Sequence, residues 1–397
     1  MTATQHLKLP WIERIERWLN QDIVCGFHSS SFVVQALESG ATLAEVECGG
    51  GHRSWDYQGQ NFVFIKDKEV LLAKSIIKET LIKVGGHLKE INCVEHIRFG
   101  SKNFFVTGGE DTTLKLWRTT LCPIATLRRH ISSIKCMAVE DYSASEKLLA
   151  TAGGRSELRL WLVVHDEAGK VSCNELACHL LKGNDKQRQK NWRDHDLIDD
   201  NEPFYSSIVI SKNKIFIACS DGALRLWTFS SNQLKLEKQS DICPNALLKI
   251  QKTTDGQLLT GDTTGRLMLW NEELQLMKTI ESGHQNGINA MLSINCGVLT
   301  GGDDGKIVIT AFDTDFTKST SKSMPSHSAA HITGILEVND GFCCVSVDQR
   351  ISFFTRELES TYQAFSHCPD ISDMLYISHE NRLIVVGSNG LESFSIR

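Results

Sequence analysis

Two segments of the chain combine residue types that could bind a phosphate backbone and stack on a nucleotide base. The first is Gly49-Gly50-Gly51-His52-Arg53-Ser54-Trp55-Asp56, in which three glycines permit backbone conformations that are closed to other residues. A histidine and an arginine could hold a phosphate, and a tryptophan could stack on a base. The sequence therefore predicts RNA or partner contacts by His52, Arg53 and Trp55; the alternative is a structural turn whose polar side chains bind carbonyl groups of the same domain.

The second segment, LKGNDKQRQKNWRD, runs from Leu181 to Asp194. Its cations and its tryptophan suit a loop that contacts phosphates and stacks on a base. The predicted contact residues are Lys186, Arg188, Lys190, Trp192 and Arg193. An acidic stretch from Asp194 to Glu202 follows at once and nearly cancels the basic field at a distance. The alternative interpretation is a long solvated loop.

Catalytic motifs are missing from the sequence. It contains no G-x-S-x-G elbow and no H-E-x-x-H helix. The run Lys66-Asp67-Lys68-Glu69 combines catalytic residue types, but consecutive residues of a hairpin point to alternating sides and cannot converge. We interpret this run as a solvated turn. The sequence therefore predicts a non-enzymatic protein with no catalytic residue, no metal site and no cofactor.

A repeated motif identifies the elements that must position these segments. Gly-Gly, a turn residue and a short alternating strand recur, as in GGEDTTLKLW and GGRSELRLW. The strands end at seven marks: Trp117, Trp161, Trp227, Trp270, Thr310, Phe354 and Ser395. All but one of the spacings between marks lie close to the period of about 40–45 residues of a four-stranded propeller blade. The longer spacing, from Trp161 to Trp227, requires an insertion, which we place at about 165–203.

Further columns accompany the marks at constant offsets. The turn position holds Asp111, Arg155, Asp221, Thr264, Asp304, Asp348 and Asn389. A histidine precedes an aliphatic residue by four positions at His87, His130, His284 and His367. Threonines recur at Thr107, Thr151, Thr260 and Thr300. These columns resemble the Trp, Thr, His, Asp hydrogen-bond chain of WD-repeat blades, so we interpret the histidines and acids as structural rather than catalytic.

The repeats predict an all-β WD-repeat β-propeller. A seven-bladed C-terminal ring should span 79–397, with Thr80–His87 supplying the outer strand that the last blade lacks. Residues 1–78 also contain strand patterns, and we expect them to form about two terminal blades of an upstream propeller; the alternative is one larger ring. One short segment, Trp11–Leu19, has apolar residues on one helical face and is predicted to be a packing helix.

Composition limits where the protein acts and what it binds. The net charge of −6 restricts any contact with nucleic acid to local regions. The sequence has no apolar run of membrane-spanning length and no signal-peptide pattern at its N-terminus, yet it has 13 cysteines. Reduced, mostly buried thiols explain these cysteines, so we expect a cytoplasmic protein without a membrane partner.

The motif GGGHRSWD, the preceding DIVCGFHSSSFVV and the insertion with its KNWR resemble a family of large WD-repeat proteins. In that family the subunit partners the tRNA ribose 2′-O-methyltransferase that acts at the anticodon wobble position. The resemblance implies a non-catalytic adaptor that binds tRNA and positions it for a partner methyltransferase. Members of the family are far longer than this chain, so contacts made by additional propellers would be missing here.

A general scaffold for protein–protein interaction is the alternative function, for example a ubiquitin-ligase substrate receptor or a trafficking platform. Ligase receptors of this fold usually carry Trp-Asp-x-Arg after a third strand. The corresponding positions here read Trp117-Arg118-Thr119 and Trp227-Thr228-Phe229, which disfavours that class without excluding it.

Overall fold

The computed structural model describes residues 9–18, 21–37, 42–52, 54–58, 61–74, 77–84, 86–180, 203–253, 255–294, 297–312, 319–325, 330–339, 341–388 and 390–396. Regular structure in these residues is β-strand apart from two 3-10 turns, Gly154–Ser156 and Ser378–Glu380. The chain divides into two compact units, one of residues 85–335 and one of residues 1–84 together with 336–397. We describe each unit by itself.

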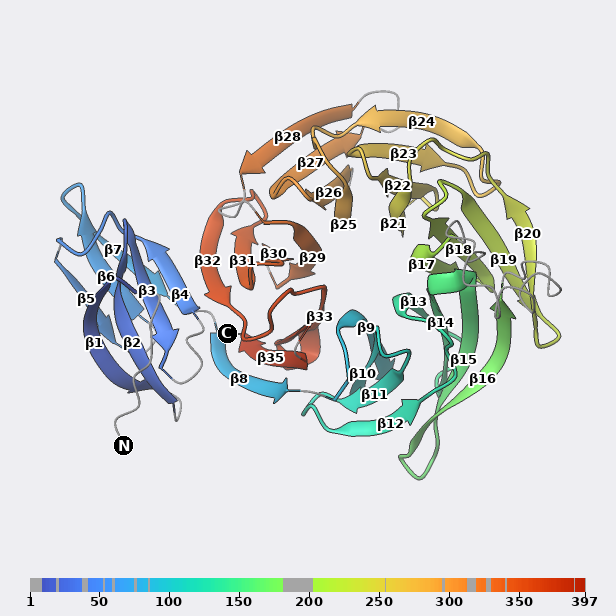
Figure 1. Ribbon diagram of the computed structural model, residues 1–397, viewed down its shortest axis with the longest axis horizontal. Coiled ribbons are helices and arrows are strands. Elements are labelled where there is room, and N and C mark those ends of the chain that lie inside the picture. Colours follow the sequence, from blue (N-terminus) through green and yellow to red (C-terminus); the bar gives the residue numbers. More distant parts are fainter. Residues whose placement is uncertain are drawn as a thin grey trace, which may run out of the picture. The chain divides into compact units, whose positions relative to one another are not determined.

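The unit of residues 85–335 contains five four-stranded antiparallel sheets, which follow one another in chain order (Figure 1). Blade 1 comprises β9 (Ile91–Phe99), β10 (Lys102–Gly109), β11 (Leu114–Arg118) and β12 (Pro123–Leu127). Blade 2 comprises β13 (Ile134–Asp141), β14 (Glu146–Gly153), β15 (Glu157–His165) and β16 (Val171–Leu180). Blade 3 comprises β17 (Tyr205–Ser211), β18 (Lys214–Cys219), β19 (Leu224–Ser230) and β20 (Gln233–Gln239). Blade 4 comprises β21 (Leu247–Lys252), β22 (Leu258–Asp262), β23 (Arg266–Trp270) and β24 (Leu276–Glu281). Blade 5 comprises β25 (Ile288–Ile294), β26 (Gly297–Gly302), β27 (Lys306–Phe312) and β28 (Ser319–Pro325).

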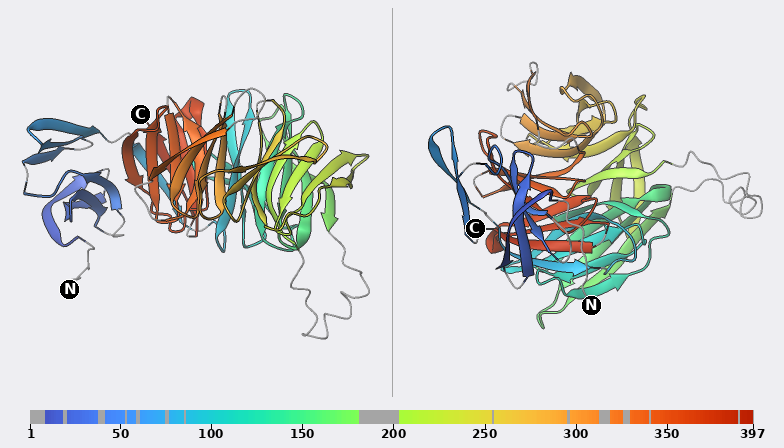
Figure 2. Two further views of the ribbon diagram at one scale, coloured as in Figure 1. Left: turned by 90° about the horizontal axis from the view of Figure 1, so that it is seen from above. Right: turned by 60° about the vertical axis from the view of Figure 1, so that its left-hand side comes forward.

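Neighbouring blades of this unit pack face to face, as the side views show (Figure 2). Val106 and Leu116 of blade 1 belong to one buried cluster with Ile134 and Trp161 of blade 2. A second cluster joins blades 2 and 3, and further clusters join the next two pairs. The alternation of apolar and polar residues along each strand therefore buries one set of side chains between sheets.

The second unit contains two further four-stranded blades. Blade 6 comprises β29 (Ile332–Val338), which crosses the boundary between the units, β30 (Gly341–Ser346), β31 (Arg350–Thr355) and β32 (Ser360–Phe365). Blade 7 comprises β33 (Asp373–Ile377), β34 (Arg382–Gly387), β35 (Gly390–Ile396) and β8 (Ile77–Val84). β8 pairs antiparallel with β35, from Val84 opposite Gly390 to Ile77 opposite Ile396. The outer strand of the last blade is thus supplied from a segment far upstream in sequence, which removes an open sheet edge.

All seven repeat marks lie on the third strand of a four-stranded blade. In blade 7 the buried aromatic residue is Phe394, 1% exposed, one position before the predicted mark at Ser395. The chain is therefore an all-β WD-repeat β-propeller, as the repeats predict. Within the range 165–203 that we assign to the insertion, Val171–Leu180 form the outer strand of blade 2.

The N-terminal strands form two antiparallel groups. One contains β1 (Trp11–Trp18), β2 (Gln21–His28), β3 (Ser31–Ala36) and β4 (Thr42–Glu47). The other has three strands, β5 (Trp55–Gln58), β6 (Asn61–Lys66) and β7 (Glu69–Lys74). One residue pair, Ala44 with Ala364, links β4 to β32. Through it β1–β4 and blade 6 form one eight-stranded sheet.

The predicted helix at Trp11–Leu19 is wrong. Trp11–Trp18 is a strand that pairs with β2 along its whole length. Tryptophan and isoleucine favour strands, and backbone pairing with β2 outweighs the helical spacing of the apolar residues. Trp11 and Ile15, which the helix was expected to bury, remain 56% and 63% exposed.

Candidate nucleic-acid interface

The glycine turn, residues Gly49–Asp56, connects β4 to β5. Three successive backbone N–H groups, those of Cys48, Gly49 and Gly50, donate to the carbonyl oxygen of Ser30 at 3.0, 2.8 and 3.1 Å. Gly49 and Gly50 have φ of 86° and 98°, a region that side chains rarely adopt. These three N–H groups are therefore occupied within the protein and are not free to bind an anion.

Trp55, the predicted stacking residue of the turn, belongs to an aromatic cluster. Its ring centroid lies 5.4 Å from that of Phe27, 5.3 Å from Phe32 and 6.2 Å from Phe62. A Cβ atom on Gly51 would lie 2.7 Å from the Phe27 ring, so glycine is required for this close packing. These contacts favour the structural interpretation of Trp55, because its ring is half-buried among aromatic neighbours that pack against it edge-on or at a tilt.

Arg14 of β1 was not identified from the sequence. Its guanidinium carbon lies 5.5 Å from the Trp55 ring centroid, a cation–π arrangement. The guanidinium also donates to Glu16 at 2.8 Å, to Asp56 at 3.2 Å and to the carbonyl oxygen of Tyr57 at 2.9 Å. Sequence reasoning missed Arg14 because the segment Trp11–Leu19 was predicted to be a helix, in which Arg14 would lie on the polar face.

His52 and Arg53 are the other two predicted contact residues of the glycine turn. His52 is exposed. Arg53 lies outside the described residues. The structure therefore brings His52 and Trp55 into one turn, with the imidazole at the surface and the indole ring in the aromatic cluster.

The predicted contacts of the insertion also lie outside the described residues: Lys186, Arg188, Lys190, Trp192 and Arg193. The residues that flank the insertion are described. Leu180, the last residue of β16, pairs with Glu157, and the Ser156 hydroxyl donates to the carbonyl oxygen of Pro203 at 2.5 Å. Both ends of the insertion are thus attached next to the Gly154–Ser156 turn of blade 2.

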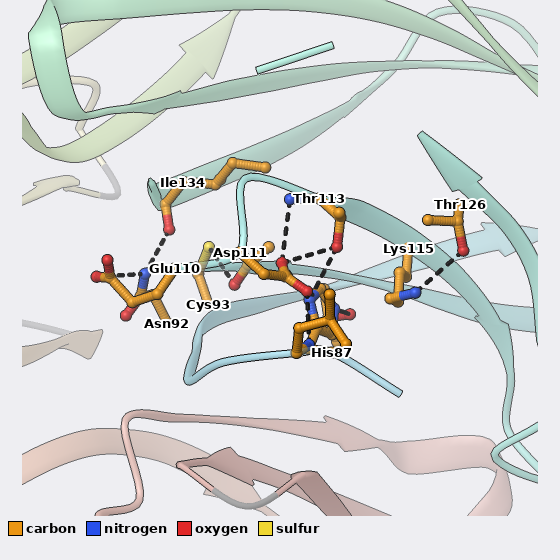
Figure 3. A network of polar contacts seen from close by, with 12 residues as sticks. His87, Asn92, Cys93, Glu110, Asp111, Thr113, Lys115, Thr126 and Ile134 are labelled. Atoms are coloured by element: carbon orange, nitrogen blue, oxygen red, sulfur yellow. Dashed lines mark hydrogen bonds and ion pairs between the residues drawn. The ribbon is translucent and has the colours of Figure 1, made fainter. Parts of the chain in front are cut away.

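The recurring histidines take part in buried hydrogen-bond chains. Figure 3 shows the part of the blade 1 chain around His87, Asp111 and Thr113. The indole N–H of Trp117 donates to Thr107 Oγ1 at 2.8 Å, and Thr107 Oγ1 lies 2.7 Å from His87 Nε2. His87 Nδ1 lies 2.9 Å from Asp111 Oδ1. A neutral imidazole that carries its proton on Nδ1 satisfies all of these groups at once.

The pKa values in blade 1 agree with this assignment. Burial lowers the pKa of His87 more than its hydrogen bond to Asp111 raises it. Burial opposes ionisation of Asp111, but hydrogen bonds from His87, Leu88 N–H and Thr113 outweigh it and lower the pKa of Asp111 to about 2. The pair is therefore a neutral imidazole beside a carboxylate, which holds the turn in place.

The same chain recurs with changes in other blades. In blade 5, His284 lies 2.9 Å from Asp304 and 3.0 Å from Thr300. In blade 2, His130 Nε2 lies 2.7 Å from Thr151, but its other nitrogen lies 3.2 Å from Glu157, not near Arg155.

Arg155 does lie in a turn, as its position in the column predicts, but blade 2 has no acid at this position. Arg155 has a φ of 53°, lies in a short 3-10 turn and is exposed, so the strand residue Glu157 supplies the acid. In blade 7, Glu392 takes this role, 3.0 Å from His367; the predicted Asn389 lies outside the described residues.

Other candidate chemistry is not assembled in the described residues. Asp67 and Lys68 form the tight turn between β6 and β7, as predicted for the Lys66–Glu69 run. The part of the chain that the structure describes contains no group of three or more His, Cys, Asp or Glu side chains that could hold a metal ion. Among the described residues, no helix has the length and hydrophobicity needed to span a bilayer.

Comparisons with known proteins agree with the fold. A family described as "WD domain, G-beta repeat" matches residues 78–118. A solved structure of a computationally designed protein, Ika8, aligns with a TM-score of 0.53 and 13% identity, covering 98% of each chain. At this identity the likeness supports the fold alone.

Relatives of known sequence are more informative. The chain is 24% identical to the "tRNA (34-2'-O)-methyltransferase regulator WDR6" of Mus musculus over 89% of the chain and 42% of that relative. For the protein of the same name in Homo sapiens the identity is 24%, over 94% of the chain and 44% of the relative. The "Lysosomal-trafficking regulator" of Homo sapiens is 24% identical over 48% of the chain and 4% of its own length.

The chain spans less than half the length of the two WDR6 relatives. Its similarity to them nevertheless extends over most of its own residues. The chain is a WD-repeat β-propeller protein that is similar, along most of its length, to proteins named as regulators of a tRNA (34-2′-O)-methyltransferase.

Proposed function

We propose that this chain is a non-catalytic, cytoplasmic adaptor that binds tRNA and positions it for 2′-O-ribose methylation of the anticodon wobble nucleotide by a partner methyltransferase. The observation that carries the proposal is the similarity over 89% of the chain to a regulator named for this reaction. A β-propeller presents many loops on a rigid scaffold, which suits a protein that holds a substrate for another enzyme.

The adaptor would accelerate methylation by positioning. Fixing the anticodon loop against the methyltransferase removes translational and rotational freedom before the chemical step. In this proposal the partner enzyme supplies the methyl donor site and all catalytic groups. The adaptor requires no cofactor of its own.

We assign the RNA contacts of this proposal to the insertion and to the glycine turn. In the insertion the contacts are Lys186, Arg188, Lys190, Trp192 and Arg193, and in the glycine turn they are His52 and Arg53. Cations that neutralise phosphates make binding depend on salt, and a tryptophan can stack on an exposed base. Trp55 contributes by holding the glycine turn in its conformation through the aromatic cluster.

We also propose a domain organisation. Residues 79–397 constitute one seven-bladed propeller, and residues 1–78 constitute terminal blades of an upstream propeller. The pairing of β8 with β35 and the separate three-stranded sheet β5–β7 support this division. The strands β1–β4 join blade 6 through the single residue pair of Ala44 with Ala364.

Deletion of the gene tests the proposed function. We expect the 2′-O-methyl mark at the wobble nucleotide of substrate tRNAs to fall strongly, and to return when the wild-type gene is restored. A catalytically inactive partner methyltransferase provides the reference for complete loss. Unchanged methylation in the deletion strain would overturn the proposal, and recovery of ubiquitin-ligase components with the tagged chain would favour the scaffold alternative.

A further inference from the structure

Three exposed arginines occur in the connections at one end of blades 1 and 2. Arg128 and Arg129 follow β12 and precede β13, and Arg155 lies in the turn between β14 and β15. All three are exposed, and none makes a hydrogen bond or ion pair with another described residue. We call these three residues the arginine surface.

Hydrogen bonds join the two connections that carry the arginines. The Ser132 hydroxyl donates to the carbonyl oxygen of Gly154 at 2.5 Å, and the N–H of Gly154 donates to the carbonyl oxygen of Ser133 at 3.0 Å. Arg155 therefore lies on a turn that contacts the same loop as Arg128 and Arg129.

The loop with Arg128 and Arg129 is anchored by contacts with the strands of blade 2. His130, the next residue, is buried and lies 2.7 Å from Thr151 and 3.2 Å from Glu157. The backbone N–H of Ile131 also donates to Glu157 at 3.0 Å. Because the backbone is fixed by these bonds, a ligand would have to order little more than the arginine side chains.

The corresponding connections of blades 3, 4 and 5 differ in charge. They are the segments 220–223, 240–246, 263–265, 282–287 and 303–305, all of them described. None of them contains a lysine or an arginine. Their charged residues are Asp221, Asp241, Asp303 and Asp304. Among these described connections, the exposed arginines therefore occur only on the two blades that precede the insertion.

We infer that the arginine surface is a contact site for the phosphate backbone of RNA. Guanidinium groups match phosphate geometry and can donate two parallel hydrogen bonds to it. The exposed aliphatic side chain of Ile131, 50% exposed, lies in the same loop and could contact a ribose or base. This inference rests on the proposed function, since it assigns to the same tRNA a second contact region, built from residues that the insertion does not include.

The test compares two matched double substitutions in the full chain. Arg128→Gln/Arg129→Gln removes two charges from the arginine surface. Arg98→Gln/Lys102→Gln removes two exposed charges from strand residues that flank the β9–β10 turn, at the opposite end of blade 1. Binding of an in vitro transcribed tRNA is measured by anisotropy over a range of salt concentrations. Each lost phosphate contact should reduce the slope of log affinity against log salt by about 0.7–0.9.

We expect the arginine variant to bind about tenfold more weakly near 0.1 M salt, with a slope reduced by about 1.5. Arg155→Gln should add a smaller loss, and the control variant should bind like wild type. Wild-type binding by the arginine variant would overturn the inference and leave the proposed function intact. A wild-type chain that fails to bind tRNA would overturn both. Loss of polyglutamate binding with unchanged tRNA binding would assign the surface to an acidic protein and overturn the inference.

Discussion

The glycine turn and the arginine surface differ in how the fold uses their polar and aromatic groups. In the glycine turn the backbone N–H groups bind Ser30, the indole of Trp55 packs on phenylalanines, and Arg14 covers the indole. Next to the arginine surface, His130 is buried and hydrogen-bonded, whereas the adjacent Arg128 and Arg129 remain exposed. Residue types and their spacing suggest the glycine turn as a binding region, whereas the contacts in the structure suggest the arginine surface.

This difference shows why free polar groups, and not conspicuous motifs, identify a binding surface. A tryptophan next to glycines suits RNA stacking and suits a tight, aromatic-packed turn equally well. A pair of arginines before a structural histidine has no special pattern in sequence. Only the hydrogen bonds around His130 show that the loop is rigid and that its arginines have no partner among the described residues.

The largest effect is expected for Trp55→Ala. Removing this half-buried indole from the aromatic cluster should destabilise the β5–β7 sheet by about 2–4 kcal/mol, less than for a fully buried tryptophan. Hydrogen exchange of the β5 and β6 amides should accelerate accordingly. Trp11→Ala, which removes an indole that is 56% exposed, should cost well under half as much and is the control. Loss of tRNA affinity with unchanged exchange would show that Trp55 acts as a stacking residue.

Thr151→Val should have the next largest effect. The substitution keeps the shape of the side chain but leaves His130 Nε2 and the Trp161 N–H without their partner. Buried polar groups without partners cost about 1–3 kcal/mol in the free energy of unfolding. Thr126→Val on the exposed outer strand of blade 1 is the control, with an expected change below about 0.5 kcal/mol.

Thr151→Val should also weaken tRNA binding, because the loop of Arg128 and Arg129 loses part of its anchor. Destabilisation of blade 2 without any change in the salt dependence of binding would break the proposed connection between loop rigidity and RNA contact.

Acid should loosen blade 1 before it loosens the aromatic cluster. The folded-state pKa of His87 is lowered, so the unfolded chain binds an additional proton as pH falls below about 6.5. The stability from this histidine is fully present above that pH and is lost as pH falls toward the folded-state pKa. The pKa of Asp111, about 2, adds a second loss below about pH 4.

Exchange of the β9–β11 amides should therefore rise more between pH 7 and 5 than that of the β5–β7 amides, after correction for intrinsic rates. Equal changes in both regions would contradict the assignment of a neutral, buried His87.

Arg14→Gln should have the smallest effect. The guanidinium side chain is 39% exposed, so its ion pairs with Glu16 and Asp56 are screened by water. Together with the cation–π contact we expect a loss of about 0.5–1 kcal/mol. Chemical denaturation monitored by tryptophan fluorescence measures this loss, and Arg17→Gln on the same strand is the control.

The sequence predicted the blades well because their signals repeat. Seven marks locate seven third strands, and the His, Thr and Asp columns predict the buried chains of blades 1 and 5. Errors arose where a local pattern competes with pairing between distant segments. Trp11–Trp18 has helical spacing but pairs with β2, and Glu157 replaces the expected turn residue because the Gly154–Ser156 turn differs in shape.

The candidate site was less predictable. Whether an arginine is free depends on neighbours that are distant in sequence, such as Glu157 and Thr151 around the loop of Arg128. Periodicity contains no information on these neighbours. The aromatic cluster around Trp55 and the cation–π contact of Arg14 were not predicted for the same reason.

Mapping of cross-links between the full chain and tRNA tests most directly whether the RNA contacts lie at exposed arginines that have no protein partner among the described residues. Ultraviolet cross-linking followed by mass spectrometry identifies the peptides that touch the RNA. We predict cross-links in the peptides that contain residues 128–133 and 154–156, and none in the acidic connections 240–246 and 303–305. Cross-links at Trp55 or in those acidic connections, with none at 128–133, would contradict the central claim.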